Sequence, residues 1–294
     1  MKILIAIGSK EYSKSTLQVG IKVAKAFSAS TTIVDVGEKV SEFSSKLVGL
    51  TQERMESWDF DRPGIDVLEW AFSYLARKKF IESKQIEAGF PKNTLVEKSS
   101  RRSEVFLKGT VSDQVNLILR NGDIIEELRD EVQSEFYDVT IIGGSGERHM
   151  AHDLVQYIDS SIFVVKNFDL NQQYRILCTV DDSPKTRKAV KYAVRIAQAF
   201  NIGVDLLTIS TNNQLKPSNK IAAEHAAKFM RRTGIEAKNL FEDGQPSEKI
   251  IEVAGNNNII IMGASTKSPI KKFFKGSKPL DVIENCNCPI LIVK

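Results

Sequence analysis

A polar segment with two glycines and five lysines separates two short apolar runs, Ile259–Met262 and Pro289–Val293, near the end of the chain. Gly263 directly follows the first run, and Gly276-Ser277 precedes the apolar residues of the next expected helix. Glycine lets an anion approach the backbone closely, and a helix start offers unpaired N–H groups to phosphate. The segment also contains five lysines: Lys267, Lys271, Lys272, Lys275 and Lys278. These residue types suit a phosphate-bearing ligand, although a surface connection with a serine N-cap explains the same spacing.

Two further residues are expected at the same edge of the sheet as this segment, where the predicted strands end. Asp181 follows the apolar run that ends at Val180, and Ile209 ends the next apolar run. Ligands of open parallel sheets bind beyond the carboxyl ends of the strands, where neighbouring connections diverge. A carboxylate and an apolar side chain at that edge suit a ribose hydroxyl or adenine amino group and a purine face.

The two halves of the chain repeat one pattern of elements, which would position these residues. Residues 3–36 align without a gap with residues 176–209, at an offset of 173. The identical pairs are Ile3/Ile176, Leu4/Leu177, Ala24/Ala197, Ala26/Ala199 and Phe27/Phe200. Each copy reads as strand, helix and strand, so the second strand is expected to run parallel to the first. A duplicated α/β domain is the economical explanation, with a boundary within 167–173.

Alternating strands and helices continue through the second half. The pattern predicts strands near 175–180, 204–209, 237–241, 258–262 and 289–293 and helices near 185–200, 217–233, 247–255 and 277–285. Strands that are apolar on both faces and alternate with helices indicate a parallel sheet covered on both sides. The predicted fold class is therefore α/β, with two tandem, doubly wound, five-stranded parallel-sheet domains.

The first half is longer than the second between its second and third strands. The additional residues include an amphipathic helix whose shared apolar face contains Val67, Leu68, Ala71, Phe72 and Leu75. They also include residues 93–109, which we interpret as two added strands, with Ser100–Glu104 as an ordinary charged turn. An insertion of this kind more often supplies packing or dimer surface than a ligand site.

Composition limits the class of protein. The chain has 294 residues, of which 42% are hydrophobic and 27% charged, as in soluble globular proteins. The net charge of +4 is too small to indicate nucleic acid as a general partner. The first apolar run, Ile3–Ile7, is too short for a signal peptide or a membrane helix, and three cysteines suit a reducing compartment. We therefore expect a cytoplasmic protein without a membrane segment.

The glycine segment resembles the phosphate motif of the universal stress protein family, in which G-x2-G-x9-G-[S/T] follows the fourth strand. Here Gly263, two residues, Thr266, nine residues and then Gly276-Ser277 reproduce the spacing. The stretch ILCTVDDS, which contains Asp181, is similar to the family's first strand, and CNCPILIVK is similar to its usual ending. The resemblance covers residues 174–294 and, more loosely, 1–166. It implies a degenerate domain over 1–168, with an insertion near 38–115, and a nucleotide-binding domain over 174–294.

The resemblance also implies a ligand and its contacts. In the family the aspartate and the second-strand residue hold adenine and ribose, and the last residue of the fourth strand and the glycine loop hold sugar and phosphates. The expected cofactor-binding residues are Val180, Asp181, Ile209, Met262, Gly263, Ser265, Thr266, Gly276, Ser277 and Lys278. The expected cofactor is an adenine nucleotide, ATP or AMP, with Mg²⁺ as its companion ion. Thr266 departs from the second glycine, which predicts a weakened site or a preference for fewer phosphates.

The first half departs further from this motif. Gly8 stands where the second half has Asp181, and Gly143-x2-Gly146 is not followed by Gly-Ser. We therefore expect a degenerate copy that binds no nucleotide. We expect no metal site either, because His149, His152 and Asp153 lack a fourth ligand, and Cys286-x-Cys288 reads as packed thiols.

The predicted function is that of a nucleotide-responsive stress or regulatory binding protein with an unidentified protein partner and no catalytic residue. The alternatives are a nucleotide-free scaffold or dimerisation protein and an adenylate-forming enzyme of the wider fold. The final strands of the two halves, near 162–165 and 290–293, are apolar and would be exposed edges unless they paired. We therefore expect these two strands to pair antiparallel, so that the halves form an intramolecular pseudo-dimer. A homodimer of whole chains is a further possibility that this pairing does not decide.

Overall fold

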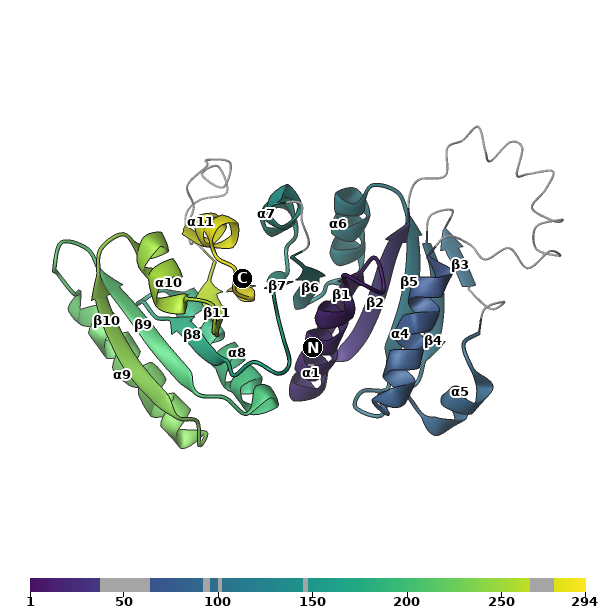
Figure 1. The fold of residues 1–294 in the computed structure, drawn as a ribbon, viewed down its shortest axis with the longest axis horizontal. Coiled ribbons are helices and arrows are strands. Elements are labelled where there is room, and N and C mark those ends of the chain that lie inside the picture. Colours follow the sequence, from purple (N-terminus) through teal and green to yellow (C-terminus); the bar gives the residue numbers. More distant parts are fainter. Residues whose placement is uncertain (38–63, 92–95, 100–101, 145–147, 265–277) are drawn as a thin grey trace.

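The computed structural model describes residues 1–37, 64–91, 96–99, 102–144, 148–264 and 278–294. Side chains are described for the same residues, apart from 96–99, 148–150, 152 and 278. The described residues form one twelve-stranded, mostly parallel sheet, which crosses the whole molecule and carries helices on both faces (Figure 1). Its strand order is β10-β9-β8-β11-β12-β7-β6-β1-β2-β5-β4-β3.

The first half supplies seven of these strands. Its elements are β1 (Lys2–Ile7), α1 (Lys14–Phe27), β2 (Ser30–Gly37), α4 (Ile65–Arg77), α5 (Ser83–Ala88), β3 (Val96–Ser99), β4 (Arg102–Leu107), β5 (Val115–Asn121), α6 (Ile124–Glu135), β6 (Val139–Gly143), α7 (Arg148–Tyr157) and β7 (Ser161–Val165). Five of the strands are parallel to one another, whereas β3 and β4 form an antiparallel hairpin on the outer edge. The first half therefore has the five parallel strands that were expected, and the insertion adds two strands, as residues 93–109 predicted.

The second half has the predicted elements. They are β8 (Arg175–Thr179), α8 (Pro184–Phe200), β9 (Val204–Ser210), α9 (Pro217–Arg232), β10 (Ala237–Asp243), α10 (Pro246–Ala254), β11 (Asn258–Gly263), α11 (Lys278–Asn285) and β12 (Ile290–Val293). Their bounds agree with the sequence patterns to within about two residues, which is the usual uncertainty of element ends. Pro184, Pro217 and Pro246 each open a helix, where a missing N–H costs nothing.

Two apolar layers cover the sheet. On one face α1, α4, α8 and α9 pack against side chains such as Ile3 and Ile5. On the other face α6, α7, α10 and α11 pack against side chains such as Leu4. The alternation follows from the period of two along a strand, and burial on both faces explains the continuous apolar runs in the sequence.

The last strands of the halves pair antiparallel, as the sequence analysis predicted. In β7 and β12, Ile162 lies opposite Ile292, Phe163 opposite Leu291, and Val164 opposite Ile290. All six side chains are buried. The pairing turns two exposed edges into the centre of one sheet, so the halves share a continuous backbone hydrogen-bond network.

The predicted insertion helix is confirmed, but the predicted charged turn is wrong in part. The face of α4 that contains Leu68 and Leu75 is buried. Arg102 and Glu104, which were expected in a surface turn, instead belong to β4 and are buried. The reason is that Arg102 meets carboxylates of Glu104 and of Glu131 on α6, so its charge is compensated inside the protein.

Candidate functional site

The candidate site lies where β8, β9 and β11 end. β8 is parallel to both neighbours, with Thr179 opposite Leu207 and Cys178 opposite Ile261. The chain leaves β8 through α8 toward β9 on one side, and it leaves β11 through α11 toward β12 on the other. Two connections therefore diverge at this edge, which is the general position of ligand sites in open α/β sheets.

Asp181 is held at the beginning of α8 by a short turn. Its Oδ1 atom accepts hydrogen bonds from the Ser183 backbone N–H (3.0 Å) and the Thr186 hydroxyl (2.5 Å). The Asp181 N–H in turn donates to Thr186 Oγ1 at 3.2 Å. The residue is exposed, so a carboxylate in a defined orientation faces solvent beside a helix start. Such a group can accept hydrogen bonds from hydroxyl or amino groups of a ligand.

Gly263 allows the end of β11 to approach the first turn of α8. A Cβ atom on this glycine would lie 2.9 Å from Lys185 Cβ and 3.4 Å from the Lys185 carbonyl carbon. The first contact is too short for ordinary carbon atoms, so any larger residue would push the strand away from the helix. Gly263 is therefore required for the juxtaposition of β11 and the Asp181 turn.

The three predicted apolar residues differ in their exposure. Val180 is 3% exposed and Met262 is 4% exposed, in opposite layers of the core. Their side chains complete the core, so a ligand at this edge would reach them mainly through backbone atoms. Ile209 is only half-buried and follows directly on the β8–β9 pairing, so it offers apolar surface.

The other predicted residues are described in part or not at all. Ser265, Thr266, Gly276 and Ser277 lie outside the described residues. Lys278 opens α11, but its side chain is not described. The structure thus brings Asp181, Ile209 and Gly263 to one edge, and the contribution of the glycine segment remains a prediction.

The first half preserves the turn but not its carboxylate. Ser13, the counterpart of Thr186, accepts hydrogen bonds from the N–H groups of Gly8 (2.9 Å) and Ser9 (3.3 Å). The same turn therefore forms with glycine in place of Asp181. Because Gly8 has no side chain, this position lacks the carboxylate that Asp181 presents in the second half.

Sequence reasoning missed Asp35, which lies beside that turn. Together with Gly8, Gly64 and Asp66 it lines a cavity of about 550 Å³ at the ends of β1 and β2. The Asp35 side chain is buried, and burial, reinforced by the charge of Asp66, raises its pKa to about 7. The only signal in the sequence was an aspartate within a β-branched run, at the position of Thr208 in the second half.

Among the described residues, no three His, Cys, Asp or Glu side chains form a group that could hold a metal ion. The side chains of His149 and His152 are not described. Cys286 and Cys288 are buried, and the Cys288 thiol contacts the Gly255 carbonyl oxygen at 3.0 Å, which agrees with packed thiols. No helix in the described part of the chain is both long and apolar enough to cross a bilayer.

Known proteins resemble this chain in sequence and in fold. The family model "Universal stress protein family" matches residues 174–294. Universal stress protein MJ0577 of Methanocaldococcus jannaschii is 30% identical over 122 residues, which are 40% of this chain and 75% of that protein. A crystal structure of a universal stress protein from Archaeoglobus fulgidus covers 100% of this chain and 96% of its own, at 15% identity and a TM-score of 0.60. A universal stress protein of the same organism in complex with dAMP covers 41% of this chain, at 21% identity and a TM-score of 0.34.

Proposed function

Because the chain belongs to the universal stress protein family, we propose that its second half binds one adenine nucleotide and that the protein is a nucleotide-responsive regulatory binding protein. The observation that carries this proposal is the held carboxylate of Asp181 beside Gly263, at the edge where the connections of β8 and β11 diverge. AMP and ATP both contain the groups that this edge suits.

Each part of the nucleotide has a counterpart in this arrangement. The Asp181 carboxylate accepts from a ribose hydroxyl or the adenine amino group, and Ile209 contacts the purine face. The phosphates extend from Gly263 toward Lys278, over the segment whose glycines, hydroxyls and lysines suit anions. Mg²⁺ would act through the phosphates, because it binds nucleotides mainly through their oxygens and its own waters.

Binding without efficient turnover fits the carboxylates at this edge. Asp181 accepts two hydrogen bonds through Oδ1, which fix it as an acceptor. Asp182 faces α9, where its Oδ2 accepts from the Ser218 hydroxyl at 2.8 Å. We therefore propose that nucleotide binding, rather than nucleotide hydrolysis, changes the interaction of the protein with its partner.

Calorimetric titration with AMP and ATP tests the proposal, using Asp181→Asn as the variant. Asparagine retains an oxygen for Ser183 and Thr186, so the turn should persist while the charge is lost. We expect one nucleotide per wild-type chain and about ten-fold weaker binding by the variant, because a charge-assisted hydrogen bond becomes a neutral one.

Asp182→Asn is the matched control, since it removes a neighbouring carboxylate that points to α9. Its affinity should remain close to that of the wild type. Unchanged binding by Asp181→Asn, or two equivalent sites in the wild-type chain, would contradict the proposed site. Repeating the ATP titration with EDTA tests the contribution of Mg²⁺.

A further inference from the structure

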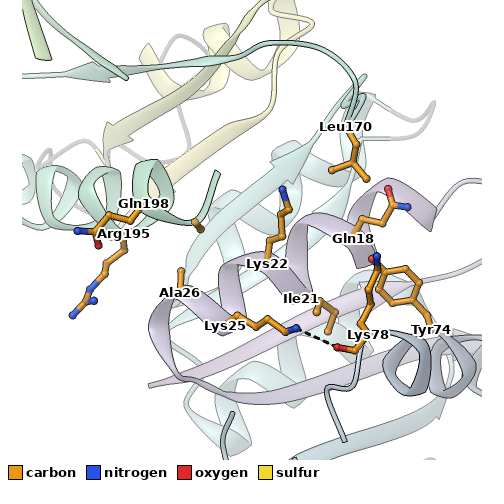
Figure 2. Close-up of a pocket in the computed structure, with 11 residues that line it drawn as sticks. Gln18, Ile21, Lys22, Lys25, Ala26, Tyr74, Lys78, Leu170, Arg195 and Gln198 are labelled. Carbon is orange, nitrogen blue, oxygen red and sulfur yellow. Dashed lines mark hydrogen bonds between the residues drawn. The ribbon is translucent and has the colours of Figure 1, made fainter. Parts of the chain in front are cut away.

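A second cavity lies between the two halves, away from the proposed nucleotide edge. It has a volume of about 540 Å³ and is bordered by α1, α4, α8 and the connection between the halves. Figure 2 shows Lys22 and Lys25 projecting from α1, with Arg195 on the α8 side and Lys78 on the α4 side. A volume of this size is typical of small-molecule sites.

The two helices that meet at this cavity carry only positive charge. α1 contains Lys14, Lys22 and Lys25, and it has no acidic residue. The same is true of α8, whose basic residues are Lys185, Arg187, Lys188, Lys191 and Arg195. Of these, Lys22, Lys25 and Arg195 line the cavity, together with Lys78 at the end of α4, so four cations surround it. Such a concentration attracts anions and favours their binding in a concave site.

The cations that line the cavity are not neutralised by carboxylates in the described part of the chain. The Lys22 ammonium lies 4.7 Å from the centre of the Phe200 ring. The Lys25 ammonium donates to the Lys78 carbonyl oxygen at 3.2 Å, and the Lys78 ammonium lies 5.8 Å from the Tyr74 ring centre. Neither these three lysines nor Arg195 forms an ion pair with a described residue.

The remaining lining residues are apolar or small. They include Ile21, Ala26, Tyr74, Leu170 and Ala199. Ala26 and Ala199 occupy equivalent positions in the duplicated sequence, as do Lys22 and Arg195. The cavity therefore has matching parts from both halves, and its small residues leave space where α1 and α8 pack together.

We infer that this cavity binds a small organic anion that has a phosphate group on an aromatic or aliphatic body. The cations that line the cavity attract the phosphate, with Lys22 and Arg195 contributed by equivalent positions of the two halves, and the body rests on the alanines and Tyr74. This site is separate from the nucleotide edge, because Ser183 and Arg195 are about 18 Å apart along α8 at 1.5 Å per residue. It requires both halves, so it belongs to the tandem chain rather than to either repeat.

The probe for the test is 1-naphthyl phosphate, which combines an aromatic body with a phosphate and is intrinsically fluorescent. The full chain is titrated with it near neutral pH. The double variant Lys22→Gln, Arg195→Gln should bind about ten-fold more weakly, because two of the four cations that line the cavity are lost. A separate variant, Ala199→Phe, should fill the cavity and block binding without changing charge.

The matched control is Lys14→Gln, Lys191→Gln, which removes one cation from each of the same helices at exposed positions that do not line the cavity. We expect its affinity to fall by less than about three-fold, because solvent and salt screen distant charges. Equal weakening in both double variants would overturn the site and leave only a diffuse positive field.

Three further results would also overturn the inference. They are equally tight binding of neutral 1-naphthol, unchanged binding by Ala199→Phe, and loss of 1-naphthyl phosphate binding in Asp181→Asn, which would place the probe at the nucleotide edge. Thermal unfolding of each variant, followed by circular dichroism, confirms that the measured chains are folded.

Discussion

At the scale of single residues, the two halves show how one turn can serve two purposes. The turn after the first strand depends on a hydroxyl, supplied by Ser13 in one half and Thr186 in the other. The residue at the ligand-facing position can then differ between the halves, Asp181 in one and Gly8 in the other, without loss of the turn. The turn and the proposed ligand contact thus depend on different residues of the same short segment.

Asp35 leads to a prediction on pH-dependent stability. Its pKa is raised by burial, and then by Asp66, to about 7. Between its ordinary value and 7 the folded protein binds more protons than the unfolded chain, so stability falls as the pH rises through this range. Asp35→Asn is neutral at every pH, like the equivalent Thr208, so it should remove this pH-dependent loss of stability. From the shift in pKa, the loss is at most about 4 kcal/mol.

Urea denaturation at about pH 5 and about pH 8 checks this prediction. The stability of Asp35→Asn relative to the wild type should be higher at the upper pH than at the lower one. Asp66→Asn, at an exposed neighbouring position, should show a smaller difference in the same direction. The same relative stability at both pH values would show that Asp35 does not titrate in this range.

At the scale of elements, a buried ionic cluster joins the added hairpin to α6. Glu131 Oε2 accepts from Arg102 Nε on β4 at 2.9 Å and from Arg120 Nε on β5 at 2.8 Å. Its Oε1 accepts from the Tyr137 hydroxyl at 3.0 Å. Arg120 also pairs with Glu127 at 2.5 Å. The insertion is therefore anchored by compensated charges as well as by strand pairing.

Glu131→Gln should destabilise the protein by about 3–5 kcal/mol, because breaking a buried ion pair leaves arginine charges without full compensation. Glu126→Gln, on the exposed side of α6, should cost less than about 1 kcal/mol. Denaturant unfolding of both variants measures the difference. Equal effects would mean that the cluster contributes no more than surface charges.

The pH dependence of this cluster has the opposite sign to that of Asp35. Burial alone would raise the pKa of Glu131, but hydrogen bonds and charges from Arg102 and Arg120 outweigh burial and lower it. Its contribution to stability is therefore present above the unfolded-state pKa and is lost as the pH falls toward the folded-state value. The wild type should lose more stability than Glu131→Gln on acidification below about pH 4.5.

At the scale of the whole molecule, the β7–β12 pairing joins the two halves into one sheet, so we expect them to unfold as one unit. Phe163 is fully buried and lies opposite Leu291 of the other half. Phe163→Asp should cost more than about 4 kcal/mol, since it removes a core aromatic side chain and buries a charge. Both halves should unfold together and at lower denaturant concentration.

Phe106→Asp is the matched control, because Phe106 lies on a strand but is 54% exposed. Its unfolding should stay close to that of the wild type. Hydrogen exchange of β1 and β8 amides reports on each half separately. Protection that is lost in β1 but retained in β8 of the Phe163 variant would show that the halves fold independently.

The sequence by itself determined most of the architecture. The gapless repeat around Ile3 and Ile176, the apolar runs and the helical spacings were sufficient to predict parallel α/β halves. The apolar final strands were sufficient to predict their antiparallel pairing, because unpaired apolar edges are unfavourable. The spacing from Gly263 to Ser277 indicated a phosphate segment, and Asp181 was correctly placed at the same sheet edge as Gly263. These features are local, so residue types and the spacing of apolar residues along the sequence are enough to predict them.

Only the tertiary structure decided which charges are buried and where the halves leave a cavity. The sequence placed Arg102 at the surface, but the residue is buried because it forms an ion pair with Glu131 of another element. The pKa of Asp35 is raised to about 7 because packing against Gly64 and α4 buries its carboxyl group, and the charge of Asp66 adds to the effect. Lys22 and Arg195 lie 173 positions apart in the sequence and share one cavity only because α1 packs against α8. Burial and electrostatic environment depend on contacts between distant segments, and no local pattern in the sequence specifies them.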